Sequence, residues 1–125
     1  MTEISDELKE WLRKQLDAAV EGLIDANVFD GLMIEVKPAW VLPSQILVGK
    51  ARTQGDPASF RWFICGEVPL DHVHSDAATT PRDVIRHFAL KWQGDAERLK
   101  DEAAKVLIED AESLYTLAED DRFWD

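Results

Sequence analysis

The sequence predicts an α+β fold: an N-terminal helix, a small antiparallel β-sheet of two to three strands in a meander, and then one long broken helix or two C-terminal helices packed on the sheet. Apolar residues recur at three- and four-residue steps at both ends of the chain, and the period changes to two in the middle. Turn-forming residues separate these segments. At 125 residues, 46% of them hydrophobic, the chain has the size of one domain covering residues 1–125.

The first helix is expected over residues 5–27. Ser5 is a suitable N-cap, and the two acids that follow it suit the positive end of the helix dipole. Asn27 and the pair Asp30–Gly31 offer stop signals at the other end. The sequence therefore predicts one amphipathic helix before the sheet.

Two strands are predicted in the middle of the chain, over residues 46–52 and 60–65. The turn-forming residues 53–59 lie between them, which favours an antiparallel hairpin. Both faces of residues 60–65 are largely apolar, so this strand is expected to be central, with at least one face covered by helices. Residues 31–43 contain two prolines and leave open whether a further strand forms there, at an edge or in short pieces.

Residues 66–80 are expected to form a long connection before a second helical region. Thr80 is a good N-cap and Pro81 fits the first helical position. Apolar residues then keep helical spacing over most of the remaining chain, which as one straight helix would be roughly 58 Å long at about 1.5 Å per residue. A domain of this size has a radius of gyration near ~14 Å, so a break is expected at Gly94 or at residues 100–102.

Acidic residues dominate the two ends of the chain. The net charge is −11, and it divides into −5 over residues 1–30, +1 over residues 31–94 and −7 over residues 95–125. Such a field repels phosphate backbones and anionic lipid and attracts basic partners. We therefore expect a basic protein partner, no nucleic acid and no membrane, although acidic helices that serve solubility alone would give the same counts.

Cys65 is the single cysteine of the chain, which favours a reducing compartment because no internal disulfide can form. The first residues are acidic, unlike a basic leader, and no apolar run approaches the roughly 20 residues that span a bilayer. A cytoplasmic location is therefore expected. A thiol inside a strand is expected to be buried and inert, although a histidine beside it could make it a nucleophile. No cofactor fingerprint is present, so no cofactor is expected and catalysis is not favoured.

Histidines and acids near residue 72 are the densest group of metal-ligand types. His72 and His74 point the same way on an extended segment, as a pair of metal donors requires. Asp71 could add an oxygen and His87 a third nitrogen. The alternative interpretation is that both histidines are ordinary loop residues or helix-cap partners.

The C-terminal region combines acids with aromatic residues. We expect a basic partner to bind a set of residues there, namely Glu109, Asp110, Glu112, Asp120, Asp121 and Trp124. The alternative is that Phe123 and Trp124 fold back and fasten the terminus to the core. A third hypothesis is a homodimer that buries Trp124.

Several stretches resemble an uncharacterised family of small acidic bacterial proteins, a domain of unknown function. They are residues 66–72 (GEVPLDH), 86–93 (RHFALKWQ), 111–115 (AESLY) and 121–124 (DRFW), with 10–15 (EWLRKQ) similar as well. This resemblance covers most of the chain and implies a bacterial setting but no activity. The leading hypothesis is a non-catalytic acidic interaction module: an inhibitor, an immunity-type protein or an adaptor. The alternatives are a small metal-dependent protein or enzyme at the histidine loop, and a self-associating regulatory domain.

Overall fold

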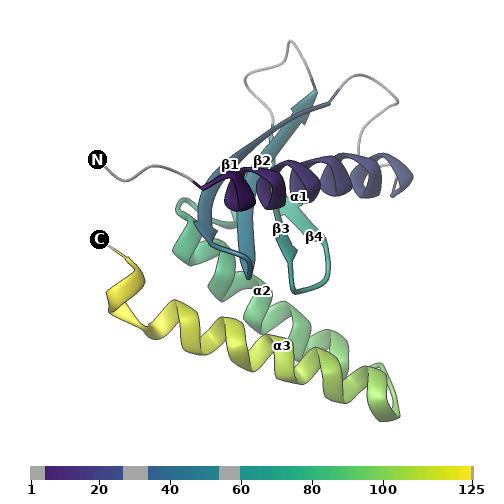
Figure 1. Cartoon of the computed structure of the whole chain (residues 1–125). Coiled ribbons are helices and arrows are strands. Elements are labelled where there is room, and N and C mark those ends of the chain that lie inside the picture. The colour runs from purple at the N-terminus through teal and green to yellow at the C-terminus, as the bar shows by residue number, and fades with distance from the viewer. Residues whose placement is uncertain (1–4, 27–33, 54–59, 125) are drawn as a thin grey trace. The chain divides into compact units, whose positions relative to one another are not determined.

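The computed structural model describes residues 5–26, 34–53 and 60–124. The chain divides into two compact units, residues 1–75 and 76–125. The elements in chain order are α1 (Asp6–Asp25), β1 (Ile34–Leu42), β2 (Ile46–Thr53), β3 (Arg61–Gly66), β4 (Asp71–His74), the 3₁₀ turn η1 (Ser75–Ala77), α2 (Pro81–Ala96), α3 (Asp101–Glu119) and the 3₁₀ turn η2 (Asp121–Phe123) (Figure 1). This order confirms the predicted α+β class, with two separate C-terminal helices.

The sheet is an antiparallel meander in the order β1-β2-β3-β4, so β2 and β3 are interior strands. The prediction that residues 60–65 form a central strand is confirmed. The predicted number of strands was low, because β4 lies in residues 66–80, which were expected to be a connection. With only four residues, two of them histidines, β4 has no apolar alternation that a sequence pattern could show.

The sequence left open whether residues 31–43 contain a strand, and the edge strand β1 lies within this segment. Residues 34–42 form a strand that pairs with β2, and its register shifts between Pro38 and Trp40. Proline is tolerated there because an edge strand does not need every backbone N–H for pairing. Residues 31–33 lie outside the described residues.

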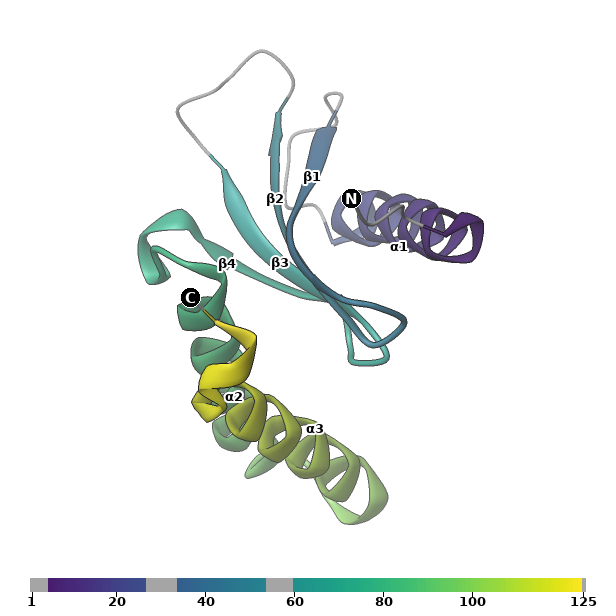
Figure 2. The ribbon, with the colours of Figure 1, turned by 60° about the vertical axis from the view of Figure 1, so that its left-hand side comes forward.

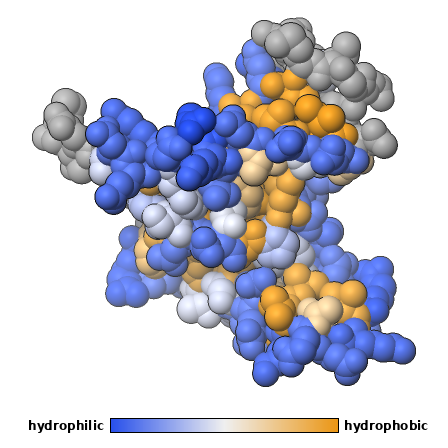
Figure 3. Space-filling model, turned by 45° about the vertical axis from the view of Figure 1, so that its right-hand side comes forward, coloured by the Kyte–Doolittle hydropathy of each residue, from blue (hydrophilic) through white to orange (hydrophobic). Residues whose placement is uncertain are grey.

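Helix α1 lies across one face of the sheet (Figures 1 and 2). Its Ala19 and Leu23 join a buried cluster whose other members are Leu47, Ala51, Phe63 and Cys65 of the strands. Burying each large side chain of this kind stabilises the fold by roughly 1.5–3 kcal/mol. The opposite, outward face of α1 is hydrophilic (Figure 3). One face of the central strands is therefore covered by a helix, as predicted.

The helix starts follow their sequence signals. The side chain of Ser5 accepts a hydrogen bond from the Leu8 N–H, and that of Thr80 accepts one from the Asp83 N–H. Pro81 is the first residue of α2. The stop signals at Asn27 and at residues 30–31 lie outside the described residues. Of the predicted turn residues 53–59, Thr53 is the last residue of β2, and residues 54–59 lie outside the described residues.

The second unit is a hairpin of α2 and α3. Of the two expected breaks, Gly94 lies inside α2, and the chain turns at residues 97–100, next to the predicted residues 100–102. Asp101 has a positive φ of 56° where α3 begins. The buried side chains of the two helices are Val84, Ile85, Phe88, Ala89, Trp92 and Ala96 in α2, and Ala111, Leu114, Leu117 and Ala118 in α3.

Candidate functional site

The solvent-facing side of α3 is acidic. The helix carries six acids and one base. Glu109 and Glu112 line a shallow depression together with Ser113 and Thr116. Neither glutamate has a basic side chain within ion-pair distance in the described part of the chain. These two carboxylates therefore keep their charge exposed to a binding partner.

Apolar side chains accompany these acids. Ile108 and Tyr115 are 41% and 53% exposed. They lie four residues before and three residues after Glu112, so all three are neighbours along one side of the helix. The side of α3 formed by Ile108, Glu109, Glu112 and Tyr115, called the acidic α3 face below, thus combines charge with exposed apolar area.

Asp110 follows Glu109 in the sequence and is half-buried, and it projects from a different side of α3 than Ile108 and Glu112, because residues two positions apart do not face each other on a helix. Burial raises the pKa of its carboxyl above the ordinary value, and the neighbouring charge of Glu109 raises it further. Because both causes disfavour the ionised form, a cation brought close to Asp110 would relieve part of this unfavourable energy.

The acids at the C-terminus are in a different situation from those on α3. Asp120 is 2.6 Å from the guanidinium of Arg122, and their hydrogen bonds lower the pKa of Asp120 to about 2. Asp121 pairs at 2.6 Å with Arg82. These carboxylates of the predicted partner-binding set are therefore already matched by arginines of the same unit.

Trp124 folds back onto its own unit. Its indole Nε1 donates a hydrogen bond of 3.1 Å to the backbone oxygen of Leu117, and the guanidinium of Arg82 lies 6.0 Å from its ring centroid. The same arginine donates from Nε to the backbone oxygen of Ala118 at 2.7 Å. Trp124 thus makes the contacts expected in the alternative in which Phe123 and Trp124 fold back, whereas Phe123 is 39% exposed.

The histidines of β4 lie on one face of the strand, as the sequence predicts. His72 is opposite Phe63 in the register, and His74 is opposite Arg61. Asp71 is on the other face, because side chains alternate along a strand. The Nε of Arg61 donates to Nδ1 of His72 at 3.0 Å, so this ring nitrogen acts as an acceptor.

His87 belongs to α2 in the second unit, where its ring lies 5.5 Å from that of Phe88. Across residues 5–26, 34–53 and 60–124, no three His, Cys, Asp or Glu side chains are grouped so that they could hold a metal ion. A metal site made of Asp71, His72, His74 and His87 stays a prediction.

Cys65 is buried, with 5% of its surface exposed. This burial raises the pKa of its thiol to about 11, so the thiolate is scarce at neutral pH. The expectation that Cys65 is buried in the core is confirmed, and its inertness stays a prediction.

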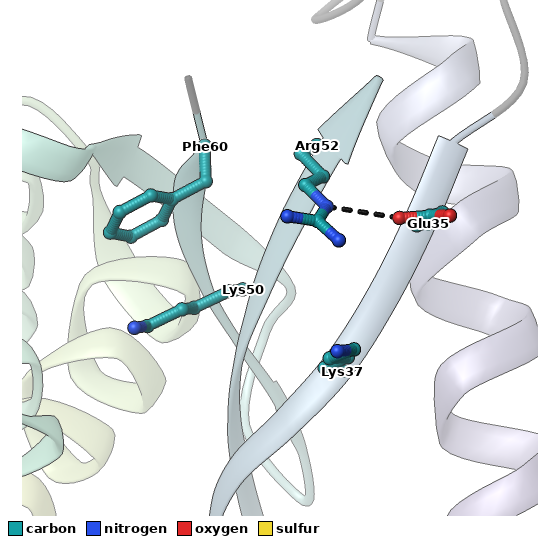
Figure 4. Close-up of a pocket in the computed structure, with 5 residues that line it drawn as sticks. All are labelled: Glu35, Lys37, Lys50, Arg52 and Phe60. Carbon is teal, nitrogen blue, oxygen red and sulfur yellow. Dashed lines mark hydrogen bonds and ion pairs between the residues drawn. The ribbon is translucent and has the colours of Figure 1, made fainter. Parts of the chain in front are cut away.

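A basic hollow, which the sequence analysis did not identify, lies on the face of the sheet opposite α1. It has a volume of about 320 Å³ and is lined by Glu35, Lys37, Lys50, Arg52 and Phe60 (Figure 4). All five belong to the first unit. Their positions alternate with Val36 and Ala51, which pack toward α1, so the hollow residues face away from that helix.

The charges of the basic hollow are arranged in cross-strand pairs. Arg52 donates from Nε to Oε2 of Glu35 at 2.9 Å. Lys37 stands opposite Lys50 in the β1–β2 register. The ammonium of Lys50 lies 4.8 Å from the ring centroid of Phe60, within the range of a cation–π contact. Neither lysine has a carboxylate within ion-pair distance among the described residues.

These features define a small acidic α+β protein with two surfaces of opposite charge. The chain belongs to a family described as a domain of unknown function, DUF4826, whose model matches residues 6–124. The match spans both units and confirms the resemblance to an uncharacterised domain family. No curated protein and no solved structure was found to match the chain. Among the described residues, no helix is both long and apolar enough to cross a bilayer.

Proposed function

We propose that this chain is a non-catalytic interaction protein, an inhibitor, an immunity-type protein or an adaptor, that binds a basic protein through the acidic α3 face. One observation carries the proposal. Glu109 and Glu112 have no basic partner among the described residues, while Ile108 and Tyr115 are exposed beside them. The acids Asp120 and Asp121, by contrast, are matched by arginines.

Charge and apolar area would act on different steps of binding. Unpaired carboxylates attract a cationic partner and raise the association rate, an effect that salt screens. Tyrosine and isoleucine supply apolar contact that salt does not weaken, and tyrosine is enriched at interfaces. The partner that fits is therefore a protein surface with lysines or arginines around an apolar residue.

The setting we propose is the bacterial cytoplasm. The resemblance to acidic bacterial proteins and the single, buried Cys65 support it, since a lone core thiol needs no oxidising compartment.

Affinity capture with matched variants tests the proposal. Immobilised wild-type chain is expected to retain a basic protein at low salt, and to lose most of it at about 0.5 M salt, where the Debye length is only a few ångströms. The double substitution Glu109→Gln/Glu112→Gln should lower the affinity for that protein by about 5- to 30-fold, since each exposed ion pair contributes up to about 1 kcal/mol. Tyr115→Ala should weaken binding without changing its salt dependence.

The matched control is Glu21→Gln/Asp25→Asn, which removes the same charge from exposed acids in the last turn of α1. This control should bind like the wild type. Equal losses in both double variants would mean that only net charge matters, and would refute a role for the acidic α3 face. A capture that retains no basic protein at low salt would also contradict the proposal.

The two other hypotheses have less support from the geometry. Trp124 is engaged by Leu117 and Arg82, so a homodimer that buries its indole would have to replace those contacts. A metal-dependent function needs ligands from several elements to converge, and within the described ranges no such group forms. Zinc addition followed by a melting curve tests the second idea, because a metal that binds the folded state raises the melting temperature.

A further inference from the structure

The basic hollow concentrates positive charge in a chain whose net charge is −11. Its lining contains three bases, Lys37, Lys50 and Arg52, against the single acid Glu35. Because Glu35 is paired with Arg52, the two lysines are an excess that no described carboxylate balances. This excess is opposite in sign to the charge of the acidic α3 face.

The two lysines stand opposite each other in the β1–β2 register, and the Lys50 side chain extends toward Phe60 (Figure 4). Like charges directly opposite in an antiparallel pair destabilise the sheet, whereas opposite charges stabilise it. The neighbouring pair Glu35 and Arg52 shows the stabilising arrangement, and the pair Lys37 and Lys50 shows the costly one. An anion bound near both ammonium groups would offset the excess positive charge that the two lysines place on this face of the sheet.

Phe60 is the aromatic residue among those that line the hollow. The Lys50 ammonium lies 4.8 Å from the Phe60 ring centroid and 4.9 Å from that of Trp62, and these two rings meet edge to face at 5.5 Å. Phe60 therefore offers a flat apolar surface beside the cationic groups (Figure 4).

The size of the hollow limits what it could hold. A volume of about 320 Å³ is at the lower end of small-molecule pockets, which run from about 300 to 1,000 Å³. A nucleic acid would in addition meet the repulsion of a strongly acidic chain. Size and charge together favour one small organic anion.

We propose that the basic hollow binds a small phosphorylated molecule that carries an aromatic group. The phosphate would meet the ammonium groups of Lys37 and Lys50 and the terminal nitrogens of Arg52, which holds Glu35 through Nε. The aromatic group would lie against Phe60. This site is separate from the acidic α3 face, and the proposal does not rest on the proposed protein partner.

Calorimetric titration of the full chain with three probes tests the proposal: phenyl phosphate, inorganic phosphate and phenol. Phenyl phosphate should bind best, inorganic phosphate more weakly, and phenol not measurably. Lys37→Gln and Lys50→Gln should each lower the affinity for phenyl phosphate by about tenfold or more, as expected when a charge-assisted hydrogen bond is lost. Phe60→Leu should reduce the preference for phenyl phosphate over inorganic phosphate.

The control for charge is Lys14→Gln, which removes an exposed lysine from α1 and should leave phenyl phosphate binding unchanged. If Lys14→Gln weakens binding as much as Lys37→Gln does, the phosphate senses only the overall charge and the proposal is refuted. Wild-type chain that binds no phenyl phosphate refutes it as well.

A melting experiment separates binding from folding. In low-salt buffer without phosphate, Lys37→Gln should melt at a slightly higher temperature than the wild type, because the repulsion from Lys50 is removed. Phenyl phosphate should then raise the melting temperature of the wild type and not that of the variant. A lower melting temperature for Lys37→Gln would assign the lysine to the fold and overturn the proposal.

Discussion

The acidic α3 face and the basic hollow differ in how much each depends on the rest of the fold. The first lies along a single helix, where residues three and four apart are neighbours whatever else the chain does. The second is made by β1, β2 and the residue before β3, so its five side chains meet only when three segments pair in register. A surface on one helix should tolerate changes to its side chains, whereas a surface built on a sheet should be sensitive to the core beneath it.

The difference between the two surfaces should be largest when a core residue beneath the basic hollow is substituted. Phe63→Ala removes a fully buried ring from the cluster between α1 and the sheet and should lower the free energy of unfolding by about 3–5 kcal/mol. Glu112→Gln on the acidic α3 face should change it by less than about 0.5 kcal/mol. Urea denaturation of the two variants measures both values. Equal effects would mean that the two surfaces do not differ in their dependence on the core.

A smaller loss of folding stability is expected from a substitution in β2, the strand that carries Lys50. A Cβ at Gly49 would lie 2.6 Å from the backbone oxygen of Lys37 and 2.6 Å from the Phe63 ring. Gly49→Ala should therefore push β1 away and cost about 1–3 kcal/mol, the usual range for overpacking. Gly94→Ala is the matched control, because its Cβ meets no atom within 4 Å and alanine favours the helix. A melting curve for Gly49→Ala that matches the wild type would contradict the close approach of β1.

The smallest expected effect on folding stability comes from the titration of two acids in the second unit, Asp120 and Asp110. Arg122 holds the pKa of Asp120 at about 2, below the ordinary value of an aspartate, so their interaction stabilises the folded state above the unfolded pKa of about 3.9 and is lost as the pH falls through about 2. Asp110 has a raised pKa, so its contribution has the opposite sign and is lost as the pH rises through the folded pKa.

Carboxyl chemical shifts followed by NMR from pH 1.5 to 6 measure both groups. Arg122→Gln should bring the pKa of Asp120 up toward the ordinary range and leave that of Asp110 unchanged. A basic partner bound at the acidic α3 face should leave the pKa of Asp120 near its free value. A shift of the Asp120 carboxyl by the partner would place the partner on the C-terminal residues as well.

Local sequence signals determined most of the fold. Ser5 and Thr80 cap their helices as predicted, and the apolar period separates helices from strands, because capping and alternation depend on residues only a few positions apart. β4 was missed because its four residues carry no period of their own, and only pairing with β3 makes them a strand. Of the two candidate breaks, Gly94 stays helical because a single glycine costs only about 1 kcal/mol in a helix.

Candidate sites depend on contacts between distant residues, and here the sequence determined less. It showed that acids gather on the terminal segments, but only the structure distinguished Glu109 and Glu112, which have no described basic partner, from Asp120 and Asp121, which arginines neutralise. Lys37 and Lys50 are thirteen positions apart, and their opposition is a property of strand register. Charge composition is fixed by the sequence, whereas the pairing of each charge is decided by tertiary structure, because electrostatic energy depends on distance and burial.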